Sequence, residues 1–466
     1  MRAAILSGEL KGGMKLPSTR ALADELNISR NTALNAYRQL LAEGYLESRE
    51  GSGTFVAHVL PELLLTAPDP STPRTAPPTL SDSPQPLFSE RAKAQMTVSQ
   101  PPSGGKSPRP FLAEAPALDA FPYQLWSRLI VRQARRLPMN TFMYQDSAGY
   151  RPLREAIAAH AAISRQVHCS PDQVMIVPGS QGALDLAARM LINTGDPVWM
   201  EDPGYPGARG AFLGAGAHIV PVPVDHEGLI VKIGIERAPQ ARLVYLTPSH
   251  QFPLGETMSL PRRLALLDWV KQANAYVIED DYDSEFRFAT RPLATLQGLD
   301  DADRVIYIGT FSKVLFPSIR IGYMILPPPL IDSFLKVRRL VDIHSQILEQ
   351  AVLADFMAEG HFTRHLRRMR ALYAKRRSTL LEAARELPLK IHSPEAGIHC
   401  VGWLPDRMDD LALASKAADY DLDLTPISSF SIEPLQRKGF LLGYGGFSVE
   451  EIKEGVRRLG TLLRSA

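Results

Sequence analysis

A lysine flanked by hydroxyl side chains and a downstream cation is the part of the sequence best suited to chemistry. Lys313 follows a strand-like apolar run, with Thr310 and Ser312 three and one positions before it and Arg320 further on. A lysine amine forms a Schiff base with an aldehyde, and an aldehyde that carries a phosphate needs hydroxyl donors and a fixed cation nearby. The stretch therefore predicts a pyridoxal-phosphate site, in which Lys313 forms the Schiff base and the other three side chains hold the phosphate.

The same cofactor needs an acid beside its pyridine nitrogen, and an acidic stretch follows a second apolar run. Asp280 and Tyr282 stand at the end of the run that begins at Ala275. A carboxylate keeps the ring nitrogen protonated, which favours Asp280 for that contact and leaves Tyr282 for the phenolate oxygen. Taken alone, Asp280 also fits an ordinary helix cap, and Lys313 an ordinary surface lysine.

Two turns that contain glycine can complete the pocket. Ser180 and Gln181 stand where a strand-like run enters a helix, and the backbone donors and positive helix end at such a place favour a phosphate. Tyr205 lies on a tight Pro-Gly loop after another strand, where its ring can stack on the cofactor. The simpler alternatives are a plain turn at Gly179 and core packing for Tyr205.

The elements that must position these side chains alternate between apolar strand-like runs and amphipathic helices. The strand-like runs include residues 173–177, 197–200, 242–247, 275–279 and 305–308. Such alternation predicts a mostly parallel sheet covered by helices. After Pro327 the pattern is helical from Leu330 to Leu381, with a break near Gly360, and then mixed, which predicts a smaller C-terminal α+β subdomain.

The first 58 residues have a different pattern, with two helical stretches and a strand-like pair. Ser18 and Ser29 are suited to be the N-caps of helices over residues 18–26 and 29–43. The second helix begins with short polar or basic side chains that can reach base edges in a major groove. Residues 45–56 predict two strand-like arms around a glycine tip that can approach a phosphate closely.

Four segments here resemble the winged helix of GntR-type regulators: residues 16–20, 29–32, 43–46 and 51–56. The DNA-binding residues that we expect from these patterns are Arg20, Ser29, Arg30, Asn31, Thr32, Arg49, Gly51 and Gly53. Family members usually have a full first helix before a pair such as Ser7-Gly8, so either this helix is short or the recorded start is too late. The alternative is a solvated helical hairpin, since residues 1–58 hold seven Lys and Arg against six Asp and Glu.

The cofactor motifs, together with Tyr144, Gly149, Leu153 and Arg154, resemble those of fold-type I aminotransferases in type and order over residues 110–466. The stretch 59–110, rich in Pro, Ser and Thr, predicts an extended linker. A winged helix (residues 1–58), this linker and an aminotransferase-like body (111–466) resemble the MocR group of GntR regulators. The resemblance implies a multidomain chain: an N-terminal winged helix-turn-helix of α+β type, then an α/β fold-type I domain. It also implies a homodimer in which Tyr144 reaches the partner's phosphate.

Two departures from the aminotransferase pattern bear on chemistry. Leu441 stands where those enzymes carry an arginine for the substrate carboxylate, and Arg209 is a possible substitute. Their Asn-Pro-x-Gly loop is replaced by residues 249–255. We therefore expect cofactor binding without efficient transamination.

Composition sets broad limits on these interpretations. Only Cys169 and Cys400 are present, far apart, so neither a disulfide framework nor a cysteine zinc site is expected. No signal peptide or membrane span is recognisable, and we expect a cytoplasmic protein that binds no membrane.

The motifs together predict a regulator that binds double-stranded DNA. Its Lys313 aldimine would sense a small amine, an amino acid or pyridoxal phosphate itself, and an amine effector would displace the lysine. One alternative is an active aminotransferase that carries a DNA-binding head. The other is a DNA-binding repressor whose body is a dimerisation scaffold without a cofactor.

Overall fold

The computed structural model describes residues 1–49, 51–61, 86–99, 108–113, 115–288, 294–394 and 396–465. These residues form two compact units, Met1–Leu87 and Phe88–Ala466. Most of the predicted linker, residues 62–85 and 100–107, lies outside the described residues. The boundaries of the three predicted domains therefore stay predictions.

The described residues of the N-terminal unit form three helices and a two-stranded antiparallel sheet: α1 Arg2–Leu6, α2 Thr19–Leu26, α3 Arg30–Ala42, β1 Leu46–Arg49 and β2 Gly53–Val56. Ser18 caps α2 by accepting a hydrogen bond from the backbone of Ala21, and Ser29 caps α3 by accepting from Thr32. Tyr37 is buried and donates to the carbonyl of Pro17 at 2.8 Å, which ties α3 to the turn before α2. The two predicted helices and the strand pair therefore share one core.

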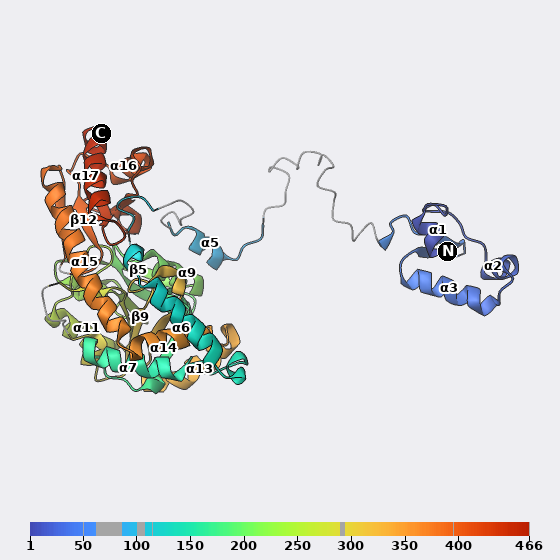
Figure 1. The fold of residues 1–466 in the computed structure, drawn as a ribbon, viewed down its shortest axis with the longest axis horizontal. Coiled ribbons are helices and arrows are strands. Elements are labelled where there is room, and N and C mark those ends of the chain that lie inside the picture. The colour runs from blue at the N-terminus through green and yellow to red at the C-terminus, as the bar shows by residue number, and fades with distance from the viewer. Residues whose placement is uncertain are drawn as a thin grey trace. The chain divides into compact units, whose positions relative to one another are not determined.

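The C-terminal unit is built on an eight-stranded mixed sheet with the order β3-β10-β9-β8-β7-β4-β5-β6. Figure 1 labels β5 and β9 of this sheet among the helices of the same unit. Its strands are β3 Val174–Val177, β4 Pro197–Asp202, β5 His218–Asp225, β6 Gly228–Leu229, β7 Leu243–Leu246, β8 Tyr276–Asp281, β9 Val305–Thr310 and β10 Gly322–Ile325. Strands β5, β4, β7, β8 and β9 are parallel neighbours, whereas β10 runs antiparallel to both β9 and β3. The sequence analysis did not single out β10.

Helices cover both faces of this sheet. Alternate residues of β3 enter different cores, Val174 and Ile176 the one and Met175 and Val177 the other, because successive side chains of a strand point to opposite faces. The helices of this part are α6 Tyr123–Arg136, α7 Arg151–Arg165, α8 Gly179–Leu191, α9 Pro206–Ala215, α10 Val231–Arg237, α11 Leu260–Ala273, α12 Leu296–Leu299, α13 Ile331–Val341 and α14 Ile347–Ala358.

The last part of the chain forms the smaller α+β subdomain that the sequence predicts. It contains α15 His361–Ala383, β11 Lys390–His392, β12 His399–Trp403, α16 Asp410–Ala417, β13 Thr425–Pro426, β14 Gly439–Gly443 and α17 Val449–Arg464. The strands make an antiparallel sheet in the order β11-β12-β14-β13. Gly360, in the left-handed region at φ 73°, separates α14 from α15, at the predicted break.

Short 3-10 helices occur in several connections. They are η1 Leu118–Ala120, η2 Met139–Phe142, η3 Pro171–Gln173, η4 Ser284–Phe286, η5 Pro317–Ile319, η6 Pro328–Leu330, η7 Ala384–Glu386, η8 Ala418–Tyr420 and η9 Ile427–Phe430.

A helix lies within the stretch that the sequence assigns to the linker. Helix α5, Glu90–Met96, packs on α9, and its Gln95 side chain donates to the carbonyl of Gly210 at 2.9 Å. Arg91 donates to the hydroxyl of Thr194 at 2.7 Å. A Cβ at Gly214 would come within 2.2 Å of Gln95, so this glycine makes room for the contact. The end of the predicted linker is thus part of the C-terminal unit.

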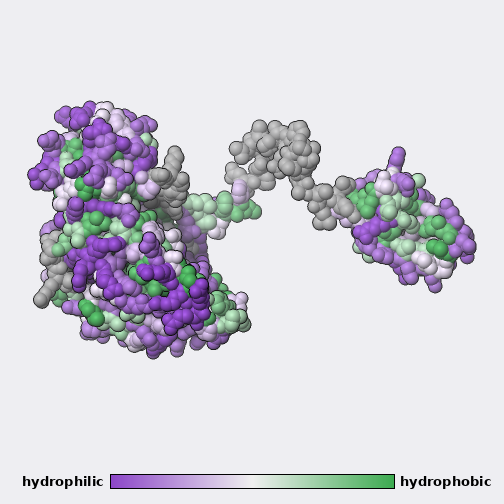
Figure 2. All heavy atoms as spheres, viewed as in Figure 1, coloured by the Kyte–Doolittle hydropathy of each residue, from purple (hydrophilic) through white to green (hydrophobic). Residues whose placement is uncertain are grey.

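Hydrophilic and hydrophobic residues are interspersed over the visible face of the C-terminal unit (Figure 2). Among the described residues, no helix has the length and apolar character needed to cross a membrane.

Candidate cofactor-binding site

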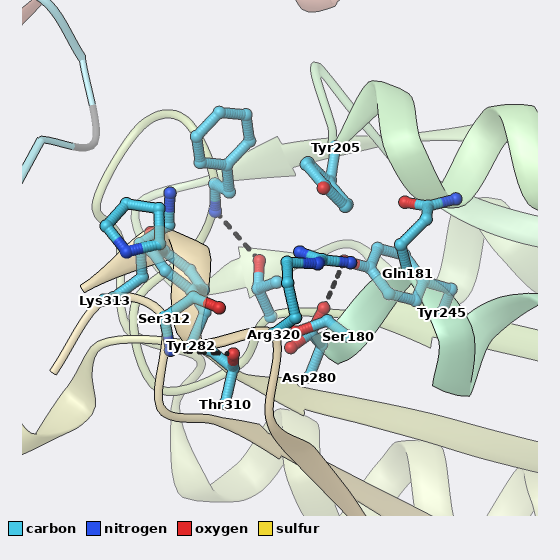
Figure 3. Close-up of a pocket in the computed structure, with 13 residues that line it drawn as sticks. Ser180, Gln181, Tyr205, Tyr245, Asp280, Tyr282, Thr310, Ser312, Lys313 and Arg320 are labelled. Atoms are coloured by element: carbon cyan, nitrogen blue, oxygen red, sulfur yellow. Dashed lines mark hydrogen bonds between the residues drawn. The ribbon is translucent and has the colours of Figure 1, made fainter. Parts of the chain in front are cut away.

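The carboxyl ends of the parallel strands surround one pocket with an empty volume of about 670 Å³ (Figure 3). All nine predicted cofactor residues line it: Ser180, Gln181, Tyr205, Asp280, Tyr282, Thr310, Ser312, Lys313 and Arg320. This is the edge at which ligands bind in open α/β sheets, since parallel strands present their ends together there. The lining also includes Tyr245, Thr247, Phe252 and Pro317, which the sequence analysis did not name as site residues.

One end of the pocket is suited to an anion. Helix α8 begins at Gly179, whose φ of 78° is in the left-handed region. The guanidinium of Arg320 donates to the carbonyl of Pro178 at 2.7 Å and lies so close that a Cβ at Gly179 would be 3.1 Å from it. The buried Ser312 Oγ has no hydrogen-bond partner among the described residues. A positive helix end, a guanidinium and an unused hydroxyl fit a phosphate group.

A pyridine nitrogen needs an acidic partner, and Asp280 is suited to that contact. Its side chain lies in the pocket near the end of β8 and is only 4% exposed. Tyr245 on the neighbouring strand β7 donates its hydroxyl to Asp280 Oδ2 at 3.0 Å. Burial and the nearby Asp280 charge raise the pKa of Tyr245 well above its usual value, so this phenol stays a donor. A buried carboxylate held in this way fits a protonated pyridine ring.

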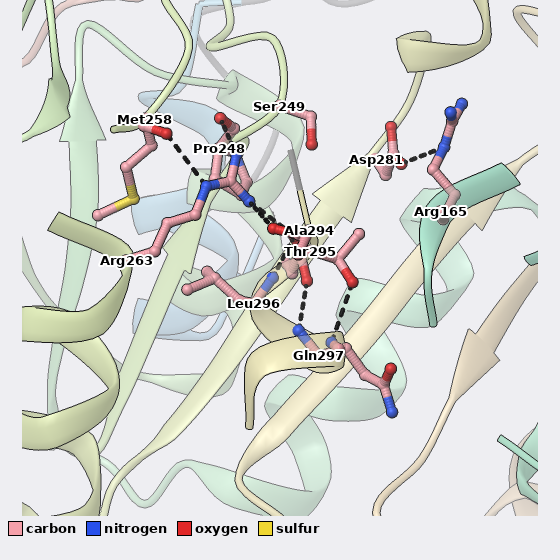
Figure 4. A network of polar contacts seen from close by, with 12 residues as sticks. Arg165, Pro248, Ser249, Met258, Arg263, Asp281, Ala294, Thr295, Leu296 and Gln297 are labelled. Atoms are coloured by element: carbon pink, nitrogen blue, oxygen red, sulfur yellow. Dashed lines mark hydrogen bonds and ion pairs between the residues drawn. The ribbon is translucent and has the colours of Figure 1, made fainter. Parts of the chain in front are cut away.

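The two acids on either side of Asp280 lie beside buried arginines. Arg165 pairs with Asp281 at 2.9 Å (Figure 4), and Tyr307 donates to the same carboxylate at 2.6 Å. Burial alone would raise the pKa of Asp281, but the charge of Arg165 and the donated hydroxyls outweigh it and lower that pKa.

Glu279 is held more weakly than Asp281. Its carboxylate accepts from the backbone of Leu296 and Gln297, and Arg263 lies 3.7 Å away. Burial raises the pKa of Glu279 to about 7, against the opposing charge of Arg263. Arg263 also donates to the carbonyls of Met258 and Pro248, so it fixes the loops beneath the pocket.

The loop that carries Tyr205 is tied to the C-terminal subdomain. Asp202 accepts hydrogen bonds from the backbone of Ile432 and Glu433, at 2.7 and 2.9 Å. Gly204 donates to the carbonyl of Phe430 at 3.1 Å. Tyr205 at the start of α9 is therefore positioned by two parts of the fold.

On the other side of the pocket, Tyr282 is hydrogen-bonded to a buried histidine. Its hydroxyl lies 3.0 Å from Nδ1 of His250, which also contacts Asp283 at 2.8 Å. The sequence analysis placed His250 only within a loop that departs from the aminotransferase pattern. A loop histidine gives no signal of such a contact before the fold is known.

Three residues that the sequence connects with the site lie away from the pocket lining. Arg209, the possible carboxylate partner, does not line the pocket, and burial lowers the pKa of its guanidinium. Tyr144 is 80% exposed. Leu441 is fully buried in an apolar cluster. No residue of the described chain therefore stands in for the missing carboxylate arginine in the lining.

The predicted DNA-binding residues form a separate set in the N-terminal unit, and all eight of them are exposed. Arg49 stacks on the ring of Phe55, with the guanidinium carbon 4.7 Å from the ring centre. The remaining side chains of the set lie in or beside the first turns of α2 and α3, or at the tip between β1 and β2.

Comparison with known proteins defines the class of each unit. Residues 127–459 match the family model for aminotransferase class I and II, a pyridoxal-phosphate-dependent fold family, and residues 1–56 match that for bacterial regulatory proteins of the gntR family. A kynurenine aminotransferase of Pyrococcus horikoshii is similar in structure, with a TM-score of 0.72 and 29% identity over 78% of this chain and 92% of that one. The predicted fold class is confirmed.

Regulators with both units are similar over nearly the whole chain. The probable rhizopine catabolism regulatory protein MocR of Rhizobium meliloti is 41% identical over 98% of this chain and 91% of that protein. The pyridoxine biosynthesis transcriptional regulator PdxR of Corynebacterium glutamicum is 30% identical over 97% of this chain and 92% of that protein. The chain belongs to the MocR-type subfamily of GntR transcription regulators, as the sequence predicts.

We predict that Glu201 makes the stability of the C-terminal unit depend on pH. This carboxyl group accepts from the backbone and hydroxyl of Thr247, yet burial raises its pKa to about 7. The folded protein then keeps a proton that the unfolded chain loses near pH 4.3, so stability falls as pH rises between about 4.5 and 7. Glu201→Gln should remove roughly 3 kcal/mol of this dependence, as measured by urea unfolding without cofactor. An unchanged pH profile in the variant would contradict the prediction.

Proposed function

We propose that this regulator binds pyridoxal phosphate through Lys313 and senses an amine by exchange at that lysine. The observation that carries the proposal is the convergence of nine side chains from distant segments on one pocket. The sequence predicts these side chains from separate motifs that meet different requirements of the same cofactor. Independent motifs that meet at one ligand-sized cavity support a shared ligand.

The proposal gives each group a role at the cofactor. Ser180, Gln181, Thr310, Ser312 and Arg320 hold the phosphate around the start of α8. Asp280 contacts the ring nitrogen, Tyr282 the phenolate oxygen and Tyr205 the face of the ring. When bound, the cofactor supplies an electrophilic carbon that a primary amine can attack.

The pocket is less suited to rapid transamination than to binding. Phe252 lines the pocket within the loop that replaces the Asn-Pro-x-Gly sequence, so an apolar ring stands in a stretch where those enzymes have a polar contact. The similarity to solved aminotransferases keeps an active enzyme as the rival proposal. Steady turnover of an amino donor and a keto acid by the purified protein would favour that rival.

A ligand shifts an equilibrium between two conformations only by its differential affinity for them. Tyr205 is the proposed point of difference between the two conformations, because its loop joins the sheet to the C-terminal subdomain. The names of relatives refer to rhizopine catabolism and pyridoxine biosynthesis, which supports a small-molecule effector and the control of metabolic genes.

We also propose that the chain is a homodimer. Exposed apolar side chains cluster around η2, with Met139 at 83%, Phe142 at 66% and Met143 at 69%. A groove between Tyr144 and α13 adjoins them, and Leu340 on α13 is 87% exposed. A contiguous exposed apolar surface of this kind fits a second copy of the chain.

The Schiff base predicts a visible absorption band that depends on one lysine. Protein incubated with pyridoxal phosphate and freed of excess should absorb in the visible range, and Lys313→Ala should not. The matched control is Lys232→Ala, which removes an exposed lysine of α10 and should leave the band unchanged. A colourless wild-type protein would favour the scaffold without cofactor.

If the first turn of α3 enters a DNA groove, removing a charge there should weaken DNA binding more than removing one further along the helix. Arg30→Ala, in the first turn, should weaken binding to the DNA upstream of the protein's own gene by about tenfold in a gel shift at fixed salt. Arg38→Ala removes the same charge from an exposed position further along α3 and is the matched control. Equal losses in both variants would argue against insertion of the first turn into a groove.

If this surface forms the dimer, a charge placed in it should halve the molecular mass of the particle in solution. Phe142→Asp buries a charge in the proposed interface and should shift the protein from dimer to monomer in light scattering after gel filtration. Ile163→Asp changes an isolated residue of α7 that is 88% exposed and should stay dimeric. A monomeric wild-type protein at micromolar concentration would refute the homodimer.

A further inference from the structure

An apolar cluster shared by the loop after β7 and the C-terminal subdomain adjoins the pocket at Phe252. We call Phe252, Val401, Ile427, Phe430 and Leu441 the apolar wall; they form one cluster, and each is at most 5% exposed. Tyr205 and Tyr282, which line the pocket, pack against the same cluster, and Phe252 belongs to both. Phe252, Tyr205 and Tyr282 therefore connect the pocket to the apolar wall, whose other members pack behind Phe252 and do not line the pocket.

Leu441 lies at the centre of this wall. In the small sheet it pairs with Val401 of β12 on one side and with Thr425 of β13 on the other. In front of it, Phe252 packs edge-to-face on Phe430, with ring centres 5.0 Å apart. Aminotransferases carry an arginine for the substrate carboxylate at this position. Here the position is occupied by Leu441, which is packed among apolar side chains.

The positive charges near the pocket have other roles. Among the described residues of the lining, the cationic side chains are Lys313 and Arg320. The proposed function assigns Lys313 to the aldehyde and Arg320 to the phosphate. His399 lies beside the wall, 6.2 Å from Phe252 between ring centres, and burial, together with His250 and Lys313, lowers its pKa well below the usual value. This imidazole is neutral at neutral pH and offers no counter-charge.

A carboxylate beside Phe252 would therefore be buried without a cation of its own, which is costly. An apolar group in the same place would bury its surface against aromatic rings, which is favourable. We propose that the effector is a primary amine with an apolar body and no carboxylate on the carbon that bears the nitrogen.

This inference rests on the proposed function, because the amine exchanges with Lys313 at the cofactor. The nitrogen of the amine forms a C=N bond to the cofactor's aldehyde carbon while the bond from that carbon to Lys313 Nζ breaks. Two protons pass from the incoming nitrogen to Lys313 Nζ in the exchange. No electron is gained or lost, so the step needs no oxidant or reductant.

The test compares amines with the amino acids that differ from them only by the carboxylate. Isoamylamine is paired with L-leucine, and 2-phenylethylamine with L-phenylalanine. Each is titrated into the full-length protein loaded with pyridoxal phosphate, and both the visible spectrum and the affinity for DNA are followed. We expect each amine to act at a concentration about 100-fold lower than its amino acid.

The outcomes separate the two proposals. If the loaded protein has a band that depends on Lys313, but the amino acid acts at an equal or lower concentration than its amine, this inference is wrong and the proposed function stands. If neither amine changes the spectrum, the inference is likewise wrong. If no band forms at all, the proposed function fails and the inference fails with it.

A variant tests the wall directly. Leu441→Arg places a cation in it and should narrow the difference between amine and amino acid by at least about tenfold. Leu441→Met, similar in size and uncharged, is the control and should keep the wild-type ranking. An arginine variant that folds but keeps that ranking would overturn the assignment to this wall. If the arginine variant does not fold, the paired titrations of the wild-type protein decide the question.

Discussion

Three consecutive carboxyl groups are buried at the end of β8, and the site depends on how the fold accommodates them. An uncompensated buried carboxylate is costly, so each needs a partner. Arg165 and Tyr307 hold Asp281, while Arg263 and two backbone amides hold Glu279. Both outer carboxyls thus point into the fold, and Asp280 between them points into the pocket, because side chains alternate along a strand. The arginines therefore stabilise the orientation of the strand end as well as its charge.

The pocket and the cluster beside it differ in composition. The large sheet contributes charged and hydroxyl groups at the ends of its parallel strands, and these groups suit a cofactor with a phosphate and a ring nitrogen. The small sheet contributes Leu441 and Val401 to the apolar wall, which adjoins the pocket at Phe252. Asp202 joins the two by accepting from the hydroxyl of Ser431 and from the backbone of Ile432 and Glu433. The proposals for the cofactor and for the amine thus rest on different parts of the chain.

Much of this site was predictable because parallel strands bring their carboxyl ends to one edge. Tyr245 and Thr247 follow the same rule, since the predicted run 242–247 ends at the pocket, and could have been included. Other features depend on contacts between distant segments. Arg165 and Asp281 meet only after α7 packs on the sheet, and Phe252 enters the pocket through a loop whose sequence departs from the family pattern. Strand β10 was missed because a four-residue strand that follows a Pro-containing turn has little pattern of its own.

The packing of α5 on α9 has a geometric consequence. Helix α9 has ten residues and begins directly after Tyr205, while the carbonyl of Gly210 and the space beside Gly214 receive Gln95. A short helix moves as a rigid rod, so a tilt at its first turn is transmitted to its last. Tyr205, which we propose stacks on the cofactor, and the contact with α5 at Gly210 and Gly214 are thus linked through one short helix.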